Sequence, residues 1–322
     1  MNRSIDASEK VEAMPVVSVI TTGGTIASRT TEGVAEPVLA GRDLLRDVAD
    51  LSQFRIRNLM MKDSATLKLA DMQAISHAIT EEFGDPGVRG VIVLHGTDSM
   101  EETSFLAELQ QTDLRPVVFT GAQFTADDER SDGPANIKLA VRTVLDWSPE
   151  EDANPAGGNV RVAFDGMVFV PRGLYKASTD SEDAFAQFNP SGQMTRLPDS
   201  DVSGIRVDVV LVPPGSDSVQ IDASIAAGAR GIVLACPGSG NSTPEVVEAV
   251  RRHVSNGVAV IVTSRVPQGL LSPIYGGGGG GYDLVEAGAI YSHFLRSSQA
   301  RILLAALLAS GADRGGIQRA FG

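Results

Sequence analysis

The sequence predicts an α/β protein with two domains of mostly parallel sheet, a larger N-terminal domain followed by a smaller C-terminal domain. Short apolar runs typical of buried strands alternate with longer helical segments along the 322 residues, as in consecutive β-α-β units. A stretch rich in Pro, Ser, Gly and Asp interrupts this alternation at residues 189–206, and its composition is that of a linker. The alternation resumes near Asp208, where a second domain begins.

The composition limits the cellular setting and the partners. With 40 acidic and 27 basic residues the net charge is −13, and no basic stripe occurs, so nucleic acid and membranes are poor partners. The single cysteine, Cys236, excludes an intrachain disulfide and favours a reducing compartment. No signal-peptide core or long apolar run occurs, so we expect a cytoplasmic protein. Four scattered histidines lack metal-ligand spacing, and we expect neither a metal nor a cofactor.

Residues 1–14 are polar and are predicted to form a mobile arm, and residues 15–190 to form the N-terminal domain. Val16–Thr21 has only Ser and Thr as polar residues and is typical of a buried first strand, whereas Leu69–Phe83 has helical spacing. Asp165-Gly166 is a favoured two-residue hairpin turn. The same signals predict the helices Gly41–Leu51 and Ala135–Leu145, the strands Phe54–Met61, Val91–Leu94 and Arg115–Thr120, and a hairpin of Val160–Phe164 with Met167–Val170.

The C-terminal domain, residues 208–322 after a linker at 191–207, repeats the pattern. Thr243-Pro244-Glu245 combines an N-cap, a first-turn proline and an early acid, so a helix begins there and runs to about Val254. Gly276–Gly281 are six consecutive glycines that hold no single conformation alone. The other predicted elements are the strands Val209–Val212, Gly231–Ala235 and Val258–Thr263, and the helices Ser218–Ala227 and Ser297–Leu308.

The first strand leads into a glycine turn, Thr22-Gly23-Gly24-Thr25. Glycines let the backbone turn tightly and let a ligand approach it. Such a turn can also cradle a phosphate, but G-x-G-x-x-G and G-x-x-x-x-G-K-[ST] are both absent, which argues against a nucleotide site. The polar residues 28–40 that follow are predicted to be a mobile loop able to close over a site.

A second turn follows the strand within Gly90–Thr103. Ser99-x-x-Glu102 fits a capping box for the helix that begins there. Thr97 and Asp98 therefore stand at the carboxyl end of a strand and the amino end of a helix, where open α/β sheets bind ligands. A hydroxyl beside a carboxylate there can hold a ligand amine or take part in nucleophilic chemistry. The alternative is a capped helix with no further role.

Together, Thr22-Gly23-Gly24-Thr25-Ile26-Ala27 and His95-Gly96-Thr97-Asp98-Ser99-Met100-Glu101-Glu102-Thr103 resemble the two signature segments of the bacterial-type L-asparaginases. The resemblance extends from about Val16 to the end of the chain through Gly121-Ala122, Asp132-Gly133-Pro134 with Asn136, Lys176, Gly238-Ser239-Gly240-Asn241 and Ser264-Arg265-Val266-Pro267. It implies a homotetramer, built as a dimer of dimers. Each site would lie between the N-terminal domain of one subunit and the C-terminal domain of its neighbour.

The resemblance also implies roles for individual residues. Amide hydrolysis would proceed through an acyl-enzyme on the hydroxyl of Thr25, and Thr97 would pair with Lys176 while Asp98 binds the substrate's α-ammonium. Burial would lower the pKa of the lysine from about 10.4, and Asp98 would oppose that change. Taken alone, Lys176 is typical of a solvated charge and Ser64 of a helix cap. The resemblance instead gives substrate contacts to Gly24, Ser64, Gly96, Ala122, Asn241 and Tyr275.

The chain departs from the family pattern at two places. Residues 28–40 lack the tyrosine that helps to activate the nucleophile, and Leu270–Tyr282 lacks the glutamate that reaches the neighbouring subunit's site. We predict that Tyr275 replaces the missing tyrosine in trans, the alternative being that it only packs against the glycines. The expected reaction is hydrolysis of L-asparagine. Hydrolysis of L-glutamine or another small amide, and amino-acid binding without turnover, are the alternatives.

Overall fold

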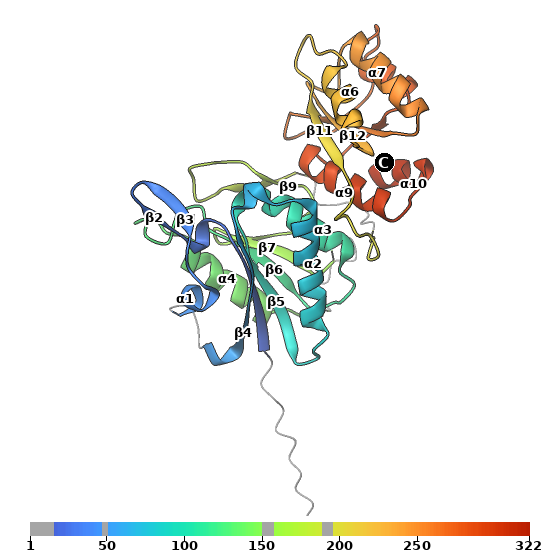
Figure 1. The fold of residues 1–322 in the computed structure, drawn as a ribbon. Helices are drawn as coiled ribbons and strands as arrows, with labels where there is room; N and C mark the ends of the chain where they lie inside the picture. Colours follow the sequence, from blue (N-terminus) through green and yellow to red (C-terminus); the bar gives the residue numbers. More distant parts are fainter. Residues whose placement is uncertain (1–15, 47–50, 150–157, 189–195) are drawn as a thin grey trace, which may run out of the picture.

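In the computed structural model the chain forms two α/β lobes that meet along helix α9 (Ser297–Ala309), as Figure 1 shows. The structure describes residues 16–46, 51–149, 158–188 and 196–322, so the predicted arm at residues 1–14 lies outside the described residues. Both lobes are built on parallel sheets, which confirms the predicted α/β class and the division into a larger first and a smaller second domain.

The first domain is a six-stranded sheet between two layers of helices. Only its last strand is antiparallel to its neighbour. The strand order is β4 (Phe54–Lys62), β1 (Val16–Gly23), β5 (Val88–Leu94), β6 (Val117–Thr120), β7 (Val160–Phe164) and β8 (Met167–Phe169). Apolar side chains alternate between the two faces of each strand. Ile92 and Leu94 pack with helices α1 (Gly41–Leu45) and α4 (Gly133–Leu145), whereas Val91 and Val93 pack with α2 (Leu69–Phe83) and α3 (Met100–Gln110).

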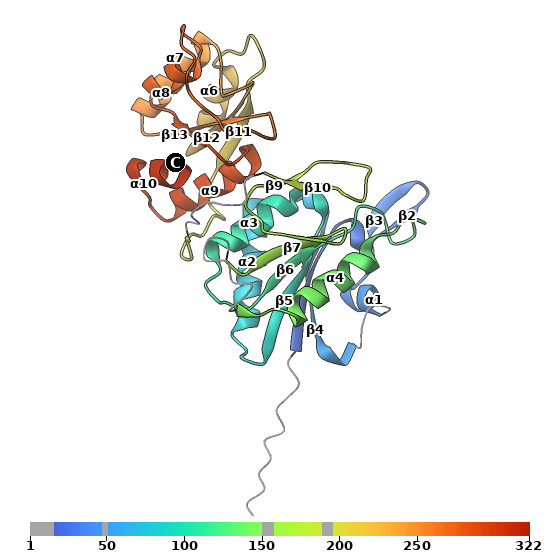
Figure 2. The same cartoon turned by 180° about the vertical axis from the view of Figure 1, so that it is seen from behind.

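The strand order reverses beside β1. From β1 the chain moves outward to the edge strand β4, and it then returns across β1 to form β5 on the other side. The helices after β1 and β5 consequently lie on opposite faces of the sheet, and Figure 2 shows α4, which shares the face of α1, in front of it. Loops that leave neighbouring strands in opposite directions open a crevice at the carboxyl ends of those strands, which is where ligands bind in this architecture.

The second domain has a four-stranded parallel sheet in simple chain order. Its strands are β11 (Val207–Leu211), β12 (Gly231–Cys236), β13 (Ala259–Ser264) and β14 (Ile290–Tyr291). One face packs against α6 (Val219–Ala226), α7 (Pro244–Ser255) and α8 (Gly281–Glu286). The other face packs against α9, which is followed by α10 (Arg314–Phe321).

The two domains share an apolar core. Leu303 and Leu304 of α9 belong to the same buried cluster as Met72 of α2 and Leu106 of α3. The almost fully buried α9 is therefore the layer between the second sheet and the first domain. No helix among the described residues is long and apolar enough to cross a bilayer.

Several elements differ from the sequence prediction. Residues 28–40, predicted to be a loop, contain a hairpin of β2 (Ser28–Thr31) and β3 (Val34–Pro37), whose turn places Glu32 and Gly33 at positive φ. Helix α1 ends at Leu45, and Leu51 begins a separate 3₁₀ turn, so the single helix Gly41–Leu51 is wrong. The short elements β9 (Leu174–Lys176), β10 (Phe185–Gln187), β14, α8 and α10 were not predicted.

Candidate active site

The turns that follow β1 and β5 meet at the crevice where the strand order reverses. The Thr22 hydroxyl at the end of β1 donates to the carbonyl oxygen of Leu94 at the end of β5, at 3.0 Å. Thr25 then begins a short 3₁₀ turn, Thr25–Ala27, and Thr97 begins another, Thr97–Ser99. The two threonines that the sequence singled out therefore come from adjacent strand ends.

Glycines allow these turns to pack directly against each other. Gly24 has φ 78° and ψ −177°, a region open almost only to glycine. A Cβ on Gly24 would lie 2.4 Å from the Cα of Gly96, and a Cβ on Gly96 would lie 2.5 Å from the Oγ of Ser64. Both contacts are too short for a real Cβ, so the backbones of three turns touch only because two glycines are present.

Ser64 lies in the third of these turns, and its side chain does not cap a helix. Its hydroxyl oxygen accepts the N–H of Asp98 at 3.2 Å. Its carbonyl oxygen accepts the hydroxyl of Ser99 at 2.8 Å. The predicted capping box is therefore wrong: the Ser99 side chain makes a tertiary bond instead, and Glu102 pairs with Arg301 of α9 at 3.4 Å.

Lys176 approaches the site from β9, a strand that pairs with β10 outside the main sheet. Its Nζ lies 2.8 Å from the Oγ1 of Thr97 and 2.7 Å from Oδ1 of Asp98. Its side chain is 19% exposed, whereas that of Asp98 is 53% exposed. The lysine is thus a bound partner of the threonine and the aspartate rather than a solvated charge, and the aspartate remains open to a ligand.

A cavity of about 210 Å³ opens over these residues. Its walls include Gly24, Thr25, Ser64, Thr97 and Asp98, and Ser28 and Pro37 border it from the β2–β3 hairpin. All of its lining residues belong to the first domain. The cavity therefore offers hydroxyl groups and a carboxylate at short range, which suits a small, polar, zwitterionic ligand.

The remaining predicted contacts lie elsewhere. Ala122 is buried after β6, in a turn whose N–H groups at Gln123 and Phe124 are bonded by the Asp132 carboxylate. Asn241 is in the second domain, where its side-chain oxygen accepts the N–H of Gly281 at 3.2 Å. Tyr275 is also in the second domain and is 56% exposed. None of Ala122, Asn241 and Tyr275 lines the cavity of its own chain.

The sequence prediction missed His95, which lies at the floor of the site. Burial lowers the pKa of His95 to about 4, so the imidazole is neutral near pH 7. Its Nδ1 lies 2.7 Å from the carbonyl oxygen of Gly96 and donates to it, and the ring edge meets Phe119. The position of a histidine between a buried strand and a glycine turn was the available signal. His95 fixes the Gly96 carbonyl without adding charge.

Glu101 was also missed as a site residue. It lies in the first turn of α3, and its Oε2 accepts the backbone N–H of Lys176 at 2.6 Å. In the sequence, an acid at the start of a helix indicates only a favourable charge for the helix dipole. The tertiary structure is what turns it toward the lysine.

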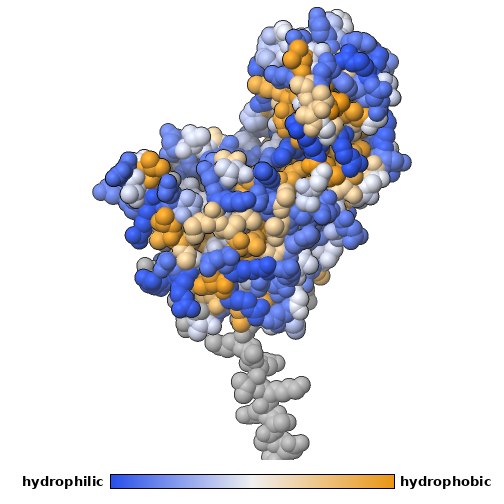
Figure 3. Space-filling model, viewed as in Figure 1, coloured by the Kyte–Doolittle hydropathy of each residue, from blue (hydrophilic) through white to orange (hydrophobic). Residues whose placement is uncertain are grey.

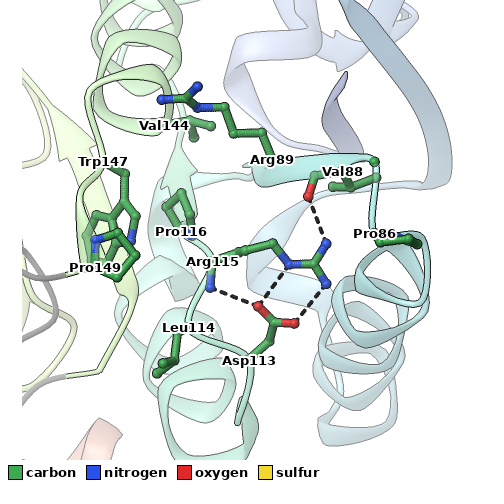
Figure 4. A pocket seen from close by; sticks show the side chains of 11 residues that line it. Pro86, Val88, Arg89, Asp113, Leu114, Arg115, Pro116, Val144, Trp147 and Pro149 are labelled. Carbon is green, nitrogen blue, oxygen red and sulfur yellow. Dashed lines mark hydrogen bonds and ion pairs between the residues drawn. The ribbon is translucent and has the colours of Figure 1, made fainter. Parts of the chain in front are cut away.

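A larger pocket, of about 460 Å³, lies at the opposite, amino ends of β5 and β6 (Figure 4). Trp147, Pro116 and Leu114 give it an apolar lining. The Arg115 guanidinium on its wall is already bonded to Asp113 and to backbone carbonyl oxygens. No lysine or threonine lines this pocket, so the smaller cavity is the better candidate for chemistry. Among the described residues, no cluster of His, Cys, Asp or Glu side chains could hold a metal ion.

Two family models match the chain. The model described as "Asparaginase, N-terminal" matches residues 16–204, and the model described as "Glutaminase/Asparaginase C-terminal domain" matches residues 206–321. Together they include the crevice at β1 and β5, the strand of Lys176 and the whole second sheet.

Individual relatives agree over nearly the full length. A "Probable L-asparaginase" of Deinococcus radiodurans is 33% identical over 96% of this chain and 98% of its own. An "L-asparaginase" of Bacillus licheniformis is 30% identical over 91% and 95%. One subunit of the glutamyl-tRNA(Gln) amidotransferase of Methanosarcina mazei is 27% identical over 88% and 72%. The crystal structure of a "Probable Cytoplasmic L-asparaginase from Campylobacter jejuni" superposes with a TM-score of 0.79 at 25% identity, covering 95% of this chain and 98% of that one.

Proposed function

The chain belongs to the asparaginase family, and we propose that it hydrolyses L-asparagine to L-aspartate and ammonia. The observation that carries the proposal is the contact of Lys176 with both Thr97 and Asp98, at the crevice that also contains Thr25. A basic group, two hydroxyl groups and a carboxylate at one crevice match what amide hydrolysis through a covalent intermediate requires.

We assign the nucleophile to Thr25. Its oxygen attacks the side-chain amide carbon of asparagine, and the C–N bond then breaks to release ammonia and leave an acyl ester on Thr25. Water cleaves that ester, which returns the hydroxyl and releases aspartate. Thr97 and Lys176 carry the proton that must reach the leaving nitrogen and then be taken from water.

Two residues hold the amino-acid end of the substrate in this proposal. The exposed Asp98 carboxylate pairs with the α-ammonium. The Ser64 oxygen accepts from the N–H of Asp98 and has no acceptor for its own hydroxyl hydrogen among the described residues. That hydrogen is free to donate to the α-carboxylate. The two groups therefore orient a zwitterion with its side chain toward the threonines.

We further propose that the site is completed by a second subunit in a homotetramer. The cavity is lined by the first domain alone and is open to solvent on its remaining side. Leu270 and Ile274 of the second domain are 68% and 72% exposed, and hydrophobic side chains also reach the surface of the second lobe in Figure 3. Exposed apolar groups of this kind are typical of surfaces that another chain covers.

L-Glutamine is the second candidate substrate, because the model that matches the second domain describes both glutaminases and asparaginases. The deciding experiment measures ammonia release from L-asparagine and L-glutamine in parallel, with calorimetric binding of L-aspartate. Faster turnover of asparagine is the expected result. Binding of aspartate with no ammonia from either amide would instead support an amino-acid-binding protein.

A further inference from the structure

The strand that carries Lys176 lies outside the main sheet. Within the described part of the chain, β9 pairs only with β10, and the pair is anchored to the first domain by the buried side chains of Leu174 and Phe185. Hydrogen bonds of the main sheet therefore do not fix Lys176 relative to Thr97. Since the lysine must stay within about 3 Å of the threonine hydroxyl to exchange a proton, other contacts have to hold this strand.

Glu101 provides one such contact and links it to the second domain. One carboxylate oxygen, Oε2, accepts the backbone N–H of Lys176 at 2.6 Å. The other, Oε1, accepts the hydroxyl of Ser298, in the first turn of α9. A single carboxylate therefore joins the backbone of the lysine to a helix of the second domain.

Gln299, the next residue of α9, holds the chain that leads into β9. Its amide nitrogen donates to the carbonyl oxygen of Pro171 at 2.7 Å and to that of Glu101 at 3.2 Å. Its amide oxygen accepts the N–H of Gly173 at 2.8 Å. The Gln299 side chain is buried, with 2% exposure, so these bonds are shielded from water and geometrically demanding.

These polar contacts lie at the edge of a tight apolar interface. Helix α9 packs on α3 through a buried cluster that includes Leu106 and Leu303. Burial raises the pKa of Glu101, while the donors from Ser298 and Lys176 oppose that rise. A buried carboxylate is stable only with such donors, so loss of the Ser298 donor also weakens the hold on Lys176.

We propose that Glu101, Ser298 and Gln299 are positioning residues that keep Lys176 in contact with Thr97, so that the seating of the second domain on α3 of the same chain is a condition of turnover. The inference rests on the proposed function, because that function gives Lys176 its part in the reaction. It is separate from any residue that a neighbouring subunit supplies.

The test compares Glu101→Ala with Glu101→Gln and with Glu102→Ala. Glu102 is the matched control, because it also binds α9, through Arg301 at 3.4 Å, whereas it does not bond to the strand of Lys176. We expect Glu101→Ala to lower kcat for asparagine about ten- to a hundredfold, with a smaller change in KM, since displacement of a reacting group by about 1 Å has effects of that size.

The conservative variant should rescue most of this loss. The amide oxygen of Glu101→Gln can accept the N–H of Lys176, and its NH₂ group can donate to the Ser298 oxygen. We expect this variant and Glu102→Ala to retain kcat within about threefold, because the lysine strand stays attached in both. Unchanged kcat in Glu101→Ala, or an equal loss in Glu102→Ala, would overturn the inference, since the second result would mean general loosening of the domains.

A crystal structure of Glu101→Ala separates this inference from the proposed function. If the wild-type protein releases no ammonia from asparagine or glutamine, the proposed function fails, but the positioning role remains measurable. We expect the distance from Lys176 Nζ to Thr97 Oγ1 to grow beyond hydrogen-bonding range, from 2.8 Å in the intact chain. An unmoved lysine in that variant contradicts the positioning role directly.

Discussion

The two domains are built from the same β-α unit, yet they differ in what they present at their strand ends. In the first sheet the segments after the neighbouring strands β1 and β5 leave toward opposite faces. In the second sheet the helices after β11 and β12, α6 and α7, pack on the same face. Reversal of strand order therefore separates the loops in the first domain, whereas the second domain has no such reversal and its loops run side by side.

The glycine turns of the two domains show the consequence. In Gly238–Asn241 of the second domain, Tyr291 donates to the carbonyl oxygen of Gly240 and the Ser239 hydroxyl donates to that of Ser272. In the first domain, the hydroxyl of Thr25 makes no hydrogen bond to any described residue, and the residue lines the cavity. One glycine turn is satisfied within its own domain, and the other leaves a hydroxyl available to a ligand.

The largest expected effect concerns the two hydroxyl groups of the first domain. Thr25→Val and Thr97→Val remove only the hydroxyl, and each should lower turnover about a thousandfold or more, because each group has a separate role in forming and cleaving the acyl ester. The matched control is Thr263→Val at a strand end of the second domain, where the hydroxyl bonds to Leu234 at 2.8 Å.

We expect Thr263→Val to lose about 1 kcal/mol of stability and to keep its turnover. Steady-state ammonia release and thermal unfolding measure the two quantities. Near-normal turnover of the Thr25 or Thr97 variant would show that the corresponding assignment is wrong.

The next effect concerns the charge at the crevice. Lys176→Met should lower kcat about a hundredfold or more, the usual contribution of a positioned proton carrier, while aspartate binding persists through Asp98 and Ser64. Lys138→Met on the exposed surface of α4 is the control. Calorimetric titration with aspartate, run beside the ammonia assay, separates binding from turnover. Equal activity of both lysine variants would return Lys176 to the status of a solvated charge.

How much of this is predictable from sequence depends on how local each signal is. The bounds of α2 and the Asp165-Gly166 hairpin turn follow from periodicity and turn chemistry alone, and both are confirmed. The β2–β3 hairpin was missed because its turn uses Glu32 where Asn, Asp or Gly is usual. The capping box failed because the carbonyl oxygen of Ser64, 35 residues away, competes for the Ser99 hydroxyl.

The site shows the same division. Spacing places Thr97 and Asp98 at a strand end, but no local pattern links Thr97 to Lys176, 79 residues later. At the level of sequence only the family resemblance joins them. The family and the α/β class are confirmed, whereas the catalytic roles stay predictions. Glu101 carries no sequence signal that distinguishes it from any acid in a first helical turn.

A smaller effect compares the glycines of the two turns. Gly24→Ala combines a glycine-only conformation with a clash against the backbone of Gly96, and it should lower the free energy of unfolding by about 3 kcal/mol or more. Gly238 also has positive φ, at 53°, but nothing lies within 4 Å of an added Cβ. Gly238→Ala should therefore cost only about 1 kcal/mol. Urea denaturation at fixed protein concentration measures both, and equal losses would contradict the packed crevice.

The smallest expected effect tests whether the second domain contributes to chemistry across a subunit interface. The β2–β3 hairpin has no tyrosine to take or orient the proton of Thr25, and a neutral threonine hydroxyl is a weak nucleophile. Tyr275 is 56% exposed in its own chain and stands immediately before the glycine run. A neighbouring subunit's Leu270–Tyr282 segment would bring this phenol to the open side of the cavity. The alternative is that the ring only packs against the glycines.

Tyr275→Phe keeps the ring and removes the hydroxyl, so it should lower kcat about tenfold or more without changing assembly if the phenol acts on Thr25; Tyr282→Phe, in the same segment and similarly exposed, is the control. Mixing decides whether the contribution comes from the neighbour. Thr25→Val subunits combined with Tyr275→Phe subunits form some sites that contain both wild-type groups only when these groups belong to different chains. Activity above the sum of the separate variants is then expected, because the Tyr275→Phe chain supplies the threonine and the Thr25→Val chain supplies the phenol. Wild-type kcat in Tyr275→Phe, or the absence of any gain in oligomers shown to be mixed, would mean that the phenol has no part in the reaction and that the first domain activates Thr25 by itself.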